Sequence, residues 1–334
     1  SNFWVIVVFF RNNSCFKEKK AISYNTSMNS VYQKTLSKKL CFNGLGLHSG
    51  KKTTIKLLPA VENEGIIFKR VDLVNNNLIK ANFSNVSSTR LCTTIENKQG
   101  VKVSTVEHLL AALYIRGIDN AIIEINNEEV PIMDGSAKDF LEHIKETDLK
   151  EQSKKRKYLK ILDKIELVDG IRNIFIEPSD SFEVEFELNY ENKIIGQQKN
   201  IVNFQKDNLK EIIESRTFCL LEDVEKIKKI GLAKGGSLDN AVVVDQDKVL
   251  NKEGLRNKKE FVNHKILDLA GDFLLSGYRI IGKVSCYHGG HELTNLFLRK
   301  IFNTMKSFQI KDHSNFEISK EFNSEKLEKI AVNG

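Results

Sequence analysis

Three side chains along one predicted helix have the types and spacing of metal ligands. His264, Asp268 and Asp272 follow one another at intervals of four residues, so they project from the same face of a helix. A histidine and an aspartate one turn apart can offer an imidazole nitrogen and a carboxylate oxygen to Zn²⁺. The spacing alone is not specific, because a His–Asp contact on a protein surface shares it. The segment therefore predicts either half of a zinc site or a surface ion pair.

A second histidine could complete the ligand set. A catalytic zinc ion takes three protein ligands and leaves one position for water. His108 lies in an apolar, helical pattern directly after Glu107. A lone histidine there is more often a buried structural residue, but the neighbouring carboxylate could accept a proton from an activated water. His291, which follows two glycines in a predicted turn, is a candidate general acid.

The hydrophobic pattern predicts the elements that would position these groups. The expected strands cover residues 31–40, 53–58, 66–71, 79–85, 120–125, 159–167, 173–177, 182–188 and 241–244. The expected helices cover residues 103–113, 138–145, 221–230 and 260–275. Ser104 or Thr105 is expected to cap the first helix, and Gly117 to end it. The order recurs in outline in the two halves, so we expect an α+β fold of two similar, facing domains, each a β-sheet layered with helices.

Length and composition agree with two domains. The 334 residues exceed one ordinary domain, and an apolar content of 41% allows a sizeable core. We expect the first domain at 31–150 and the second at 151–305, between an N-terminal extension (1–30) and a C-terminal tail (306–334). The basic run at 154–157 favours a solvated linker over a nucleic-acid surface, because no aromatic residue interleaves with it.

Several functional classes are disfavoured. The net charge of +7 is not accompanied by any nucleic-acid-binding motif, so nucleic acid is not an expected partner, whereas a small anion remains open. Five cysteines without a C-x-x-C pair argue against a disulfide scaffold, a zinc ribbon or an iron–sulfur site, and they favour a reducing compartment.

The apolar run at residues 3–10 is too short to span a bilayer and lacks the flanks of a secretory signal. We interpret residues 1–27 as an upstream extension without a functional role; a weak membrane anchor is the alternative. No other segment is long and apolar enough to cross a membrane, so stable membrane insertion is not expected.

Several blocks of the sequence together resemble UDP-3-O-acyl-N-acetylglucosamine deacetylases, the zinc enzymes of the committed step of lipid A biosynthesis in Gram-negative bacteria. The blocks occur in the family's order between about residues 33 and 302. They are residues 44–50, 91–93, 103–113, 117–120, 130–137, 215–218, 235–244, 264–272 and 289–291. The resemblance implies a cytoplasmic, monomeric enzyme with its active site between the two domains.

The resemblance also implies a role for each candidate residue. The implied metal ligands are His108, His264 and Asp268, which would hold one Zn²⁺ and could also take Fe²⁺. The implied catalytic residues are Glu107 as general base, His291 as general acid, Asp272 as the partner of His291, and Thr217 as the hydroxyl that supports the oxyanion. The implied substrate-binding residues are Lys265, Phe218, His288, Leu91, Cys92 and His48. His288 departs from the family, which often has Lys or Arg there.

The implied reaction hydrolyses the N-acetyl group of UDP-3-O-(3-hydroxyacyl)-N-acetylglucosamine to give the free amine and acetate, with water as the nucleophile and no acyl-enzyme. An insert near 220–239 is implied to form a hydrophobic passage for the acyl chain, lined by Leu221, Val224, Ile227, Ile230 and Leu232. An amphipathic helix packed on the domain would show the same apolar residues. The competing function is an inactive homologue that binds a nucleotide-sugar lipid or a regulatory partner. A zinc peptidase is disfavoured because no His-Glu-x-x-His is present.

Overall fold

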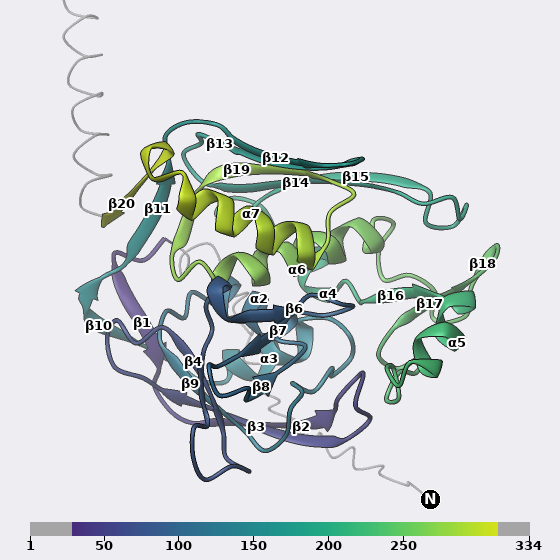
Figure 1. Ribbon diagram of the computed structural model, residues 1–334, viewed down its shortest axis with the longest axis horizontal. Coiled ribbons are helices and arrows are strands. Elements are labelled where there is room, and N and C mark those ends of the chain that lie inside the picture. Colours follow the sequence, from purple (N-terminus) through teal and green to yellow (C-terminus); the bar gives the residue numbers. More distant parts are fainter. Residues whose placement is uncertain (1–28, 313–334) are drawn as a thin grey trace, which may run out of the picture.

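The computed structural model describes residues 29–312. The predicted extension before residue 29 and the predicted tail after residue 312 lie outside the described residues. Two sheets form the outer layers of the molecule and helices lie between them (Figure 1). The secondary structure is mixed, which confirms the predicted α+β class.

The lower sheet in Figure 1 is formed by the first half of the chain. Its strand order is β2-β3-β9-β4-β5, and all neighbours are antiparallel except the parallel pair β4–β9. The strands are β2 (Leu40–Leu45), β3 (Lys52–Pro59), β4 (Ile66–Arg70), β5 (Leu78–Lys80) and β9 (Ala121–Ile125). Burial alternates along β4 and β9, so one face of this sheet packs on the core.

The upper sheet is formed by the second half. Its longest strand, β19 (Arg279–Tyr287), pairs with β11, β13 and β14 and leads toward His291. The other strands are β11 (Lys157–Ile161), β12 (Ile165–Asp169), β13 (Arg172–Glu177), β14 (Phe182–Asn189), β15 (Gln197–Asn203) and β20 (Phe308–Asp312). β20 pairs with β11, so residues 308–312 belong to the sheet and not to a tail.

Three smaller sheets complete the strands of the described region. β1 (Tyr32–Leu36) pairs with β10 (Leu149–Lys155). The second joins β6 (Val86–Ser88), β7 (Thr94–Glu96) and β8 (Lys102–Val103), and the third β16 (Phe218–Leu220), β17 (Val242–Asp245) and β18 (Lys248–Val249).

Two helices at the centre carry most of the candidate site. They are α2 (Glu107–Arg116) and α6 (Glu260–Leu274), and nearly every residue of each is buried. Gly271 permits their close approach, since a Cβ at this position would lie 2.1 Å from the Glu107 carbonyl oxygen. The remaining α-helices between residues 29 and 312 are α3 (Lys138–Lys145), α4 (Lys210–Glu214), α5 (Leu221–Lys229) and α7 (His291–Asn303). None of the helices within 29–312 combines the length and apolar character needed to cross a bilayer.

A buried charge cluster joins the two halves. The Arg156 guanidinium donates to the Asp119 carboxylate at 2.8 Å and to the Gly117 carbonyl at 2.7 Å. Arg279, at the start of β19, donates to the carbonyls of Tyr114 and Ile118. Both arginines therefore hold the C-terminal end of α2. The predicted solvated linker is wrong at Arg156, which is 1% exposed.

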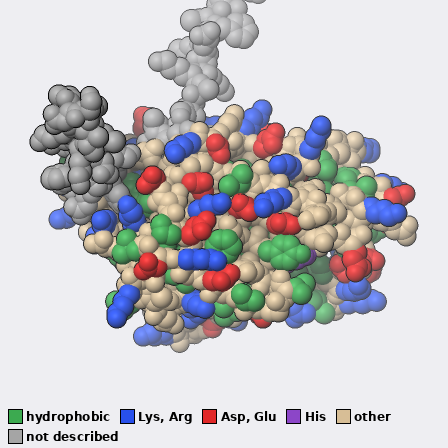
Figure 2. Space-filling view, turned by 90° about the horizontal axis from the view of Figure 1, so that it is seen from above, with side chains coloured by type: hydrophobic (Ala, Val, Ile, Leu, Met, Phe, Trp, Pro, Cys, Tyr) green, Lys and Arg blue, Asp and Glu red, His purple; other side chains and the backbone are tan. Residues whose placement is uncertain are grey.

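The outer face of the upper sheet carries both signs of charge, interspersed (Figure 2). Glu185, for example, lies between Lys199 and Lys283. This face therefore has no continuous basic surface.

Several predicted boundaries need correction. The expected strands at 31–40 and 159–167 are each two strands, and the expected strand at 79–85 ends at Lys80, before a 3₁₀ turn (Phe83–Asn85). The first helix begins at Glu107, because Val103 belongs to β8 and neither Ser104 nor Thr105 caps it. Local pattern missed these breaks because long-range pairing decides where each strand ends.

Candidate metal centre and active site

Three buried donors converge between α2 and α6. His108, His264 and Asp268 each offer one ligand atom, and these atoms lie within 4.8 Å of one another. The Asp268 Oδ1 atom lies 3.2 Å from His108 Nε2 and 3.4 Å from His264 Nε2. Among the described residues this buried oxygen has no hydrogen-bond donor in good geometry. Two imidazoles and a carboxylate facing one point are a donor set that fits Zn²⁺.

The ring of His264 is fixed by the backbone behind it. Its Nδ1 lies 3.0 Å from the Ser215 carbonyl oxygen, so Nδ1 carries the proton and Nε2 keeps its lone pair for the site. Burial lowers the pKa of His264 to about 4, which keeps the ring neutral and able to bind a metal.

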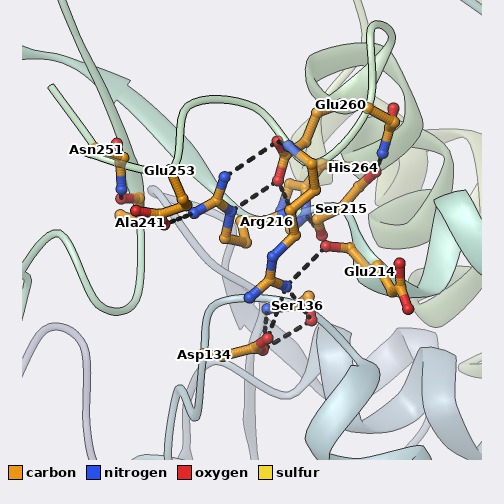
Figure 3. Close-up of polar contacts among 12 residues, drawn as sticks. Asp134, Ser136, Glu214, Ser215, Arg216, Ala241, Asn251, Glu253, Glu260 and His264 are labelled. Atoms are coloured by element: carbon orange, nitrogen blue, oxygen red, sulfur yellow. Dashed lines mark hydrogen bonds and ion pairs between the residues drawn. The ribbon is translucent and has the colours of Figure 1, made fainter. Parts of the chain in front are cut away.

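A buried ion pair holds the Ser215 carbonyl in place (Figure 3). Arg216 donates its backbone N–H and its Nε to Glu260 Oε1, at 3.0 and 2.8 Å. Glu260 precedes His264 by one turn of α6, and both side chains of the ion pair are almost completely buried. The ligand and the segment that orients it are therefore tied to the same helix.

Glu107 and His291 face each other beside this cluster. Glu107 Oε1 lies 3.6 Å from His291 Nε2, while Glu107 Oε2 accepts the Thr93 N–H at 3.0 Å. Behind His291, its Nδ1 lies 2.6 Å from Asp272 Oδ2, and Asp272 Oδ1 accepts the Thr93 hydroxyl at 2.7 Å. Glu107 and His291 thus each have one polar atom fixed by a hydrogen bond to the protein and a second polar atom that faces the donor cluster.

The electrostatics of this pair are set by burial and by the carboxylates. Burial raises the pKa of Glu107, although the neighbouring histidines oppose the shift. Burial disfavours the charged form of His291, but the carboxylates of Asp272 and Glu107 outweigh it and raise the pKa of His291 to about 10. His291 can therefore hold a proton next to a carboxylate that can accept one.

A cavity of about 430 Å³ opens onto these groups. Its wall includes Glu107, all three donors and His291. It also includes Thr217, the candidate oxyanion donor, and three of the candidate substrate contacts, Phe218, Lys265 and Leu91. The Lys265 ammonium lies 5.6 Å from the centre of the Phe218 ring. A basic group and an aromatic face beside the donors could bind an anionic, ring-containing molecule.

A second, mainly apolar cavity of about 340 Å³ adjoins the first. The two share Leu47, Leu91, Thr217, Phe218, Cys219 and Ile227. The apolar cavity also includes Leu221 and Val224 of α5, as predicted for the insert, whereas Ile230 and Leu232 are not in its wall. His48 lies in this cavity and not in the first.

Two glycine-rich turns, one from each half, close this cavity. Gly235 approaches so closely that a Cβ on it would lie 2.3 Å from the Gly46 carbonyl oxygen. The Gly235 N–H donates to the Leu47 carbonyl and the Lys234 N–H to the His48 carbonyl. The predicted tight connection at 44–50 is therefore also a docking surface for the insert.

The remaining predicted contacts lie apart from the donors. His288 has a positive φ of 54° and lines a separate cavity of about 220 Å³ with Lys265 and Tyr190. Cys92 is buried beside Thr94 and lies outside the walls of the two adjoining cavities.

Sequence reasoning missed the residues whose hydrogen bonds orient the candidate catalytic and metal-binding side chains. Thr93 bonds both Glu107 and Asp272, and Arg216 and Glu260 support His264 through Ser215. The only signal was the position of Thr93 and Arg216 inside the blocks that carry the resemblance. Helix α7, which begins at His291, was also missed, so His291 lies in the first turn of a helix and not in an isolated turn.

Comparisons with known proteins point to one enzyme family. The family model described as UDP-3-O-acyl N-acetylglycosamine deacetylase matches residues 33–303. The chain is 40% identical to the UDP-3-O-acyl-N-acetylglucosamine deacetylase of Pseudoalteromonas translucida over 282 residues, covering 84% of this chain and 93% of that protein. It is 44% identical to that of Syntrophotalea carbinolica over 281 residues (84% and 91%) and 43% identical to that of Geotalea uraniireducens over 274 residues (82% and 89%).

Proposed function

Because the chain belongs to the UDP-3-O-acyl-N-acetylglucosamine deacetylase family, we propose that His108, His264 and Asp268 bind its zinc ion and that Glu107 and His291 transfer protons in its reaction. The enzyme is a zinc-dependent hydrolase that removes the N-acetyl group in lipid A biosynthesis. The predictions of activity and zinc dependence are thereby confirmed. Bound zinc supplies a Lewis acid that polarises the acetamide carbonyl and makes water more acidic.

Glu107 is the proposed general base. Its Oε2 is occupied by the Thr93 N–H, which leaves Oε1 to accept the proton of the attacking water. The charge that develops on the carbonyl oxygen needs a donor on the other side of the cavity. Thr217 is the proposed donor, and its backbone is held between the Gly135 carbonyl and the Val242 N–H.

His291 is the proposed general acid. Asp272 holds the proton on Nδ1, so the proton on Nε2 is the one that points into the cavity. As the C–N bond breaks, His291 Nε2 can give this proton to the departing amine, and the oxygen of the attacking water leaves in acetate. The observation that carries the proposal is the 3.6 Å separation of Glu107 Oε1 and His291 Nε2 beside three converging donors.

We propose that the apolar cavity beside α5 takes the acyl chain and that Lys265 and Phe218 contact the nucleotide-sugar part. Support comes from the continuity of the two cavities, which places an apolar space directly next to the hydrolytic groups.

We further propose two similar domains, with a boundary near residue 150. Each half supplies one outer sheet and one of the two central helices. Every assigned group comes from one chain, which supports action as a monomer. The free thiols of Cys41, Cys92, Cys219 and Cys286 support a cytoplasmic location.

The proposed roles are tested by separating metal binding from turnover. Glu107→Gln should keep one zinc ion per chain and lose about 10²–10⁴-fold in kcat. His108→Ala should lose zinc as well as activity. Glu128→Gln, at a carboxylate that is 67% exposed, is the matched control and should change neither. Full activity of Glu107→Gln, or stoichiometric zinc in His108→Ala, would show that the roles are assigned wrongly.

A further inference from the structure

One arginine, Arg256, joins the two halves of the chain next to the active site. Its Nη1 donates to Asp134 Oδ2 in the first half at 2.7 Å and to the Glu214 carbonyl in the second half at 2.9 Å. Its backbone N–H donates to Glu260 Oε2 at 2.7 Å, at the start of α6. Both acceptors of the guanidinium lie below the Arg216–Glu260 ion pair in Figure 3. A single side chain thus connects a turn of one half to a segment of the other.

Segment 214–217 carries two groups of the active site. The Ser215 carbonyl oxygen lies 3.0 Å from Nδ1 of the zinc donor His264, and Thr217 is the proposed oxyanion donor. Helix α4 ends at Glu214 and strand β16 begins at Phe218, so residues 215–217 belong to neither a helix nor a strand. Their positions therefore depend on contacts with other parts of the chain.

The turn at residues 134–136 supplies one of these contacts. The Thr217 N–H donates to the Gly135 carbonyl at 2.8 Å. Asp134 fixes the turn, because its Oδ1 accepts the N–H of Ser136 at 2.9 Å and the Ser136 hydroxyl at 2.7 Å. Arg256 binds the other oxygen of the same carboxylate. The turn therefore holds segment 214–217 at both ends, directly at Thr217 and through Arg256 at Glu214.

The position of Arg256 argues against two simpler roles. Arg256 is absent from the walls of the catalytic cavity and of the apolar cavity, so it does not bind the substrate in either. Its side chain is 27% exposed, and ion pairs that remain open to solvent contribute little to stability. A geometric role, in which the arginine aligns two segments, uses all of its contacts.

We propose that Arg256 is a positioning residue: it binds Asp134 and the Glu214 carbonyl together, aligns turn 134–136 with segment 214–217, and so sets the position of the Thr217 hydroxyl. This inference rests on the proposed role of Thr217 as oxyanion donor. Without Arg256 the two segments can shift relative to each other, and a displaced donor stabilises the transition state less well.

The first test is steady-state kinetics of the zinc-loaded full chain. Arg256→Ala should lower kcat by about tenfold, with one zinc ion per chain and with KM within about twofold of the unaltered enzyme. Arg256→Lys should retain most of the activity, because one ammonium can donate to both oxygens that Nη1 contacts. Arg299→Ala is the matched control. Arg299 also donates to a carbonyl of the other half, at Phe83, and lies outside both cavity walls, so its loss should leave kcat unchanged.

The second test shows whether Arg256 acts through Thr217. In a Thr217→Val background the hydroxyl to be positioned is absent, so Arg256→Ala should lower kcat further by less than about twofold. A purely structural role would instead reduce kcat by the same factor in both backgrounds. That result, or an unchanged kcat in Arg256→Ala alone, would overturn the inference. Melting temperature and zinc content identify any variant that has failed to fold.

Thr217→Val by itself separates the inference from its premise. Loss of an oxyanion donor should lower kcat by about 10²–10³-fold. If Thr217→Val keeps full activity, the oxyanion role of Thr217 is wrong and the role of Arg256 fails with it. If Thr217→Val is impaired but the effect of Arg256→Ala is independent of it, only the positioning role fails.

Discussion

Gly271 of α6 lies directly against the backbone of Glu107 in α2, with room for a hydrogen atom and not for a methyl group. The contact sets the separation of the two helices at the level of the zinc donors. His108 follows Glu107 on one helix, and Asp268 precedes Gly271 by three residues on the other. The distance between ligands from different halves of the chain therefore depends on the absence of one side chain.

Gly271→Ala should destabilise the protein and weaken zinc binding. The added methyl group must push α2 and α6 apart, because its neighbours are backbone atoms at 2.1 and 3.0 Å. Overpacking of this kind costs about 1–3 kcal/mol. Urea unfolding and zinc titration of the apo-protein measure the two effects. Gly65→Ala, where a Cβ meets nothing within 4 Å but a φ of 75° strains an alanine, should lower stability and leave zinc affinity unchanged, which separates the two effects. Unaltered zinc binding in Gly271→Ala would contradict the argument.

Asp272→Asn should lower kcat without removing zinc. Asp272 uses one carboxylate oxygen for His291 and the other for Thr93, so an amide in its place keeps one acceptor for two donors and loses the negative charge that raises the pKa of His291. Loss of such a supporting group typically reduces activity about 10–100-fold. Steady-state kinetics and metal analysis on the same preparation check both parts. Thr93→Val removes only the second hydrogen bond of Asp272 and should have the smaller effect. Equal rates for Asp272→Asn and the unaltered enzyme would exclude this role.

Glu260→Gln should weaken zinc binding although Glu260 contacts no zinc donor atom. The substitution disrupts the ion pair with Arg216, which fixes the Ser215 carbonyl and through it the His264 ring. The expected loss of zinc affinity is about 10–100-fold, measured by competition with a chelator. Glu253→Gln is the matched control, since Glu253 also pairs with Arg216 but is 59% exposed. If the two variants bind zinc equally well, the ion pair is not a positioning device.

The cysteines should differ in their rate of alkylation according to how deeply each thiol is buried. Burial raises the pKa of both Cys92 and Cys286 to about 12, so at pH 8 almost no thiolate is present at either residue. The thiolate is the reactive form, and its fraction grows only as the pH approaches the raised pKa. Iodoacetamide at pH 8 should therefore label exposed Cys41 and spare Cys92 and Cys286 until the protein is unfolded. Peptide mapping by mass spectrometry gives the extent at each residue; rapid native labelling of Cys92 would be inconsistent with its burial.

Asp119→Asn should be strongly destabilising. Asp119 is the carboxylate shared by two buried guanidinium groups, Arg156 and Arg279. Removal of its charge takes the shared carboxylate away from two buried guanidinium groups, and breaking a buried pair costs about 3–5 kcal/mol. Urea unfolding measures the loss. Asp163→Asn, at an exposed position, should be close to neutral, and similar stabilities for the two variants would refute the argument.

Local sequence patterns predicted the site best where its residues lie on one helix. The four-residue spacing of His264 and Asp268 is a property of α6 itself, and the structure places both in the donor cluster. His108 was recognisable only as a histidine beside an acid, because its approach to α6 is a contact between distant segments. Resemblance to a known family supplied that link where periodicity could not.

The supporting residues could not be predicted for the same reason. Arg156 belongs to a basic run that has the composition of a solvated linker, and its burial depends on Asp119, 37 residues earlier. Thr93 reaches Asp272 across 179 residues. No window of local sequence contains both members of such a pair, so hydrophobic pattern and propensity carry no information about them.

The contact of Gly46 with Gly235 makes the proposed acyl cavity a shared property of the two halves. Neither half encloses the space alone, so a ligand that fills it binds only the docked arrangement. By thermodynamic linkage, such a ligand must stabilise the docking itself, by an amount set by its concentration relative to its Kd. Fatty-acyl ligands that never reach the zinc site should therefore raise the melting temperature of the whole enzyme.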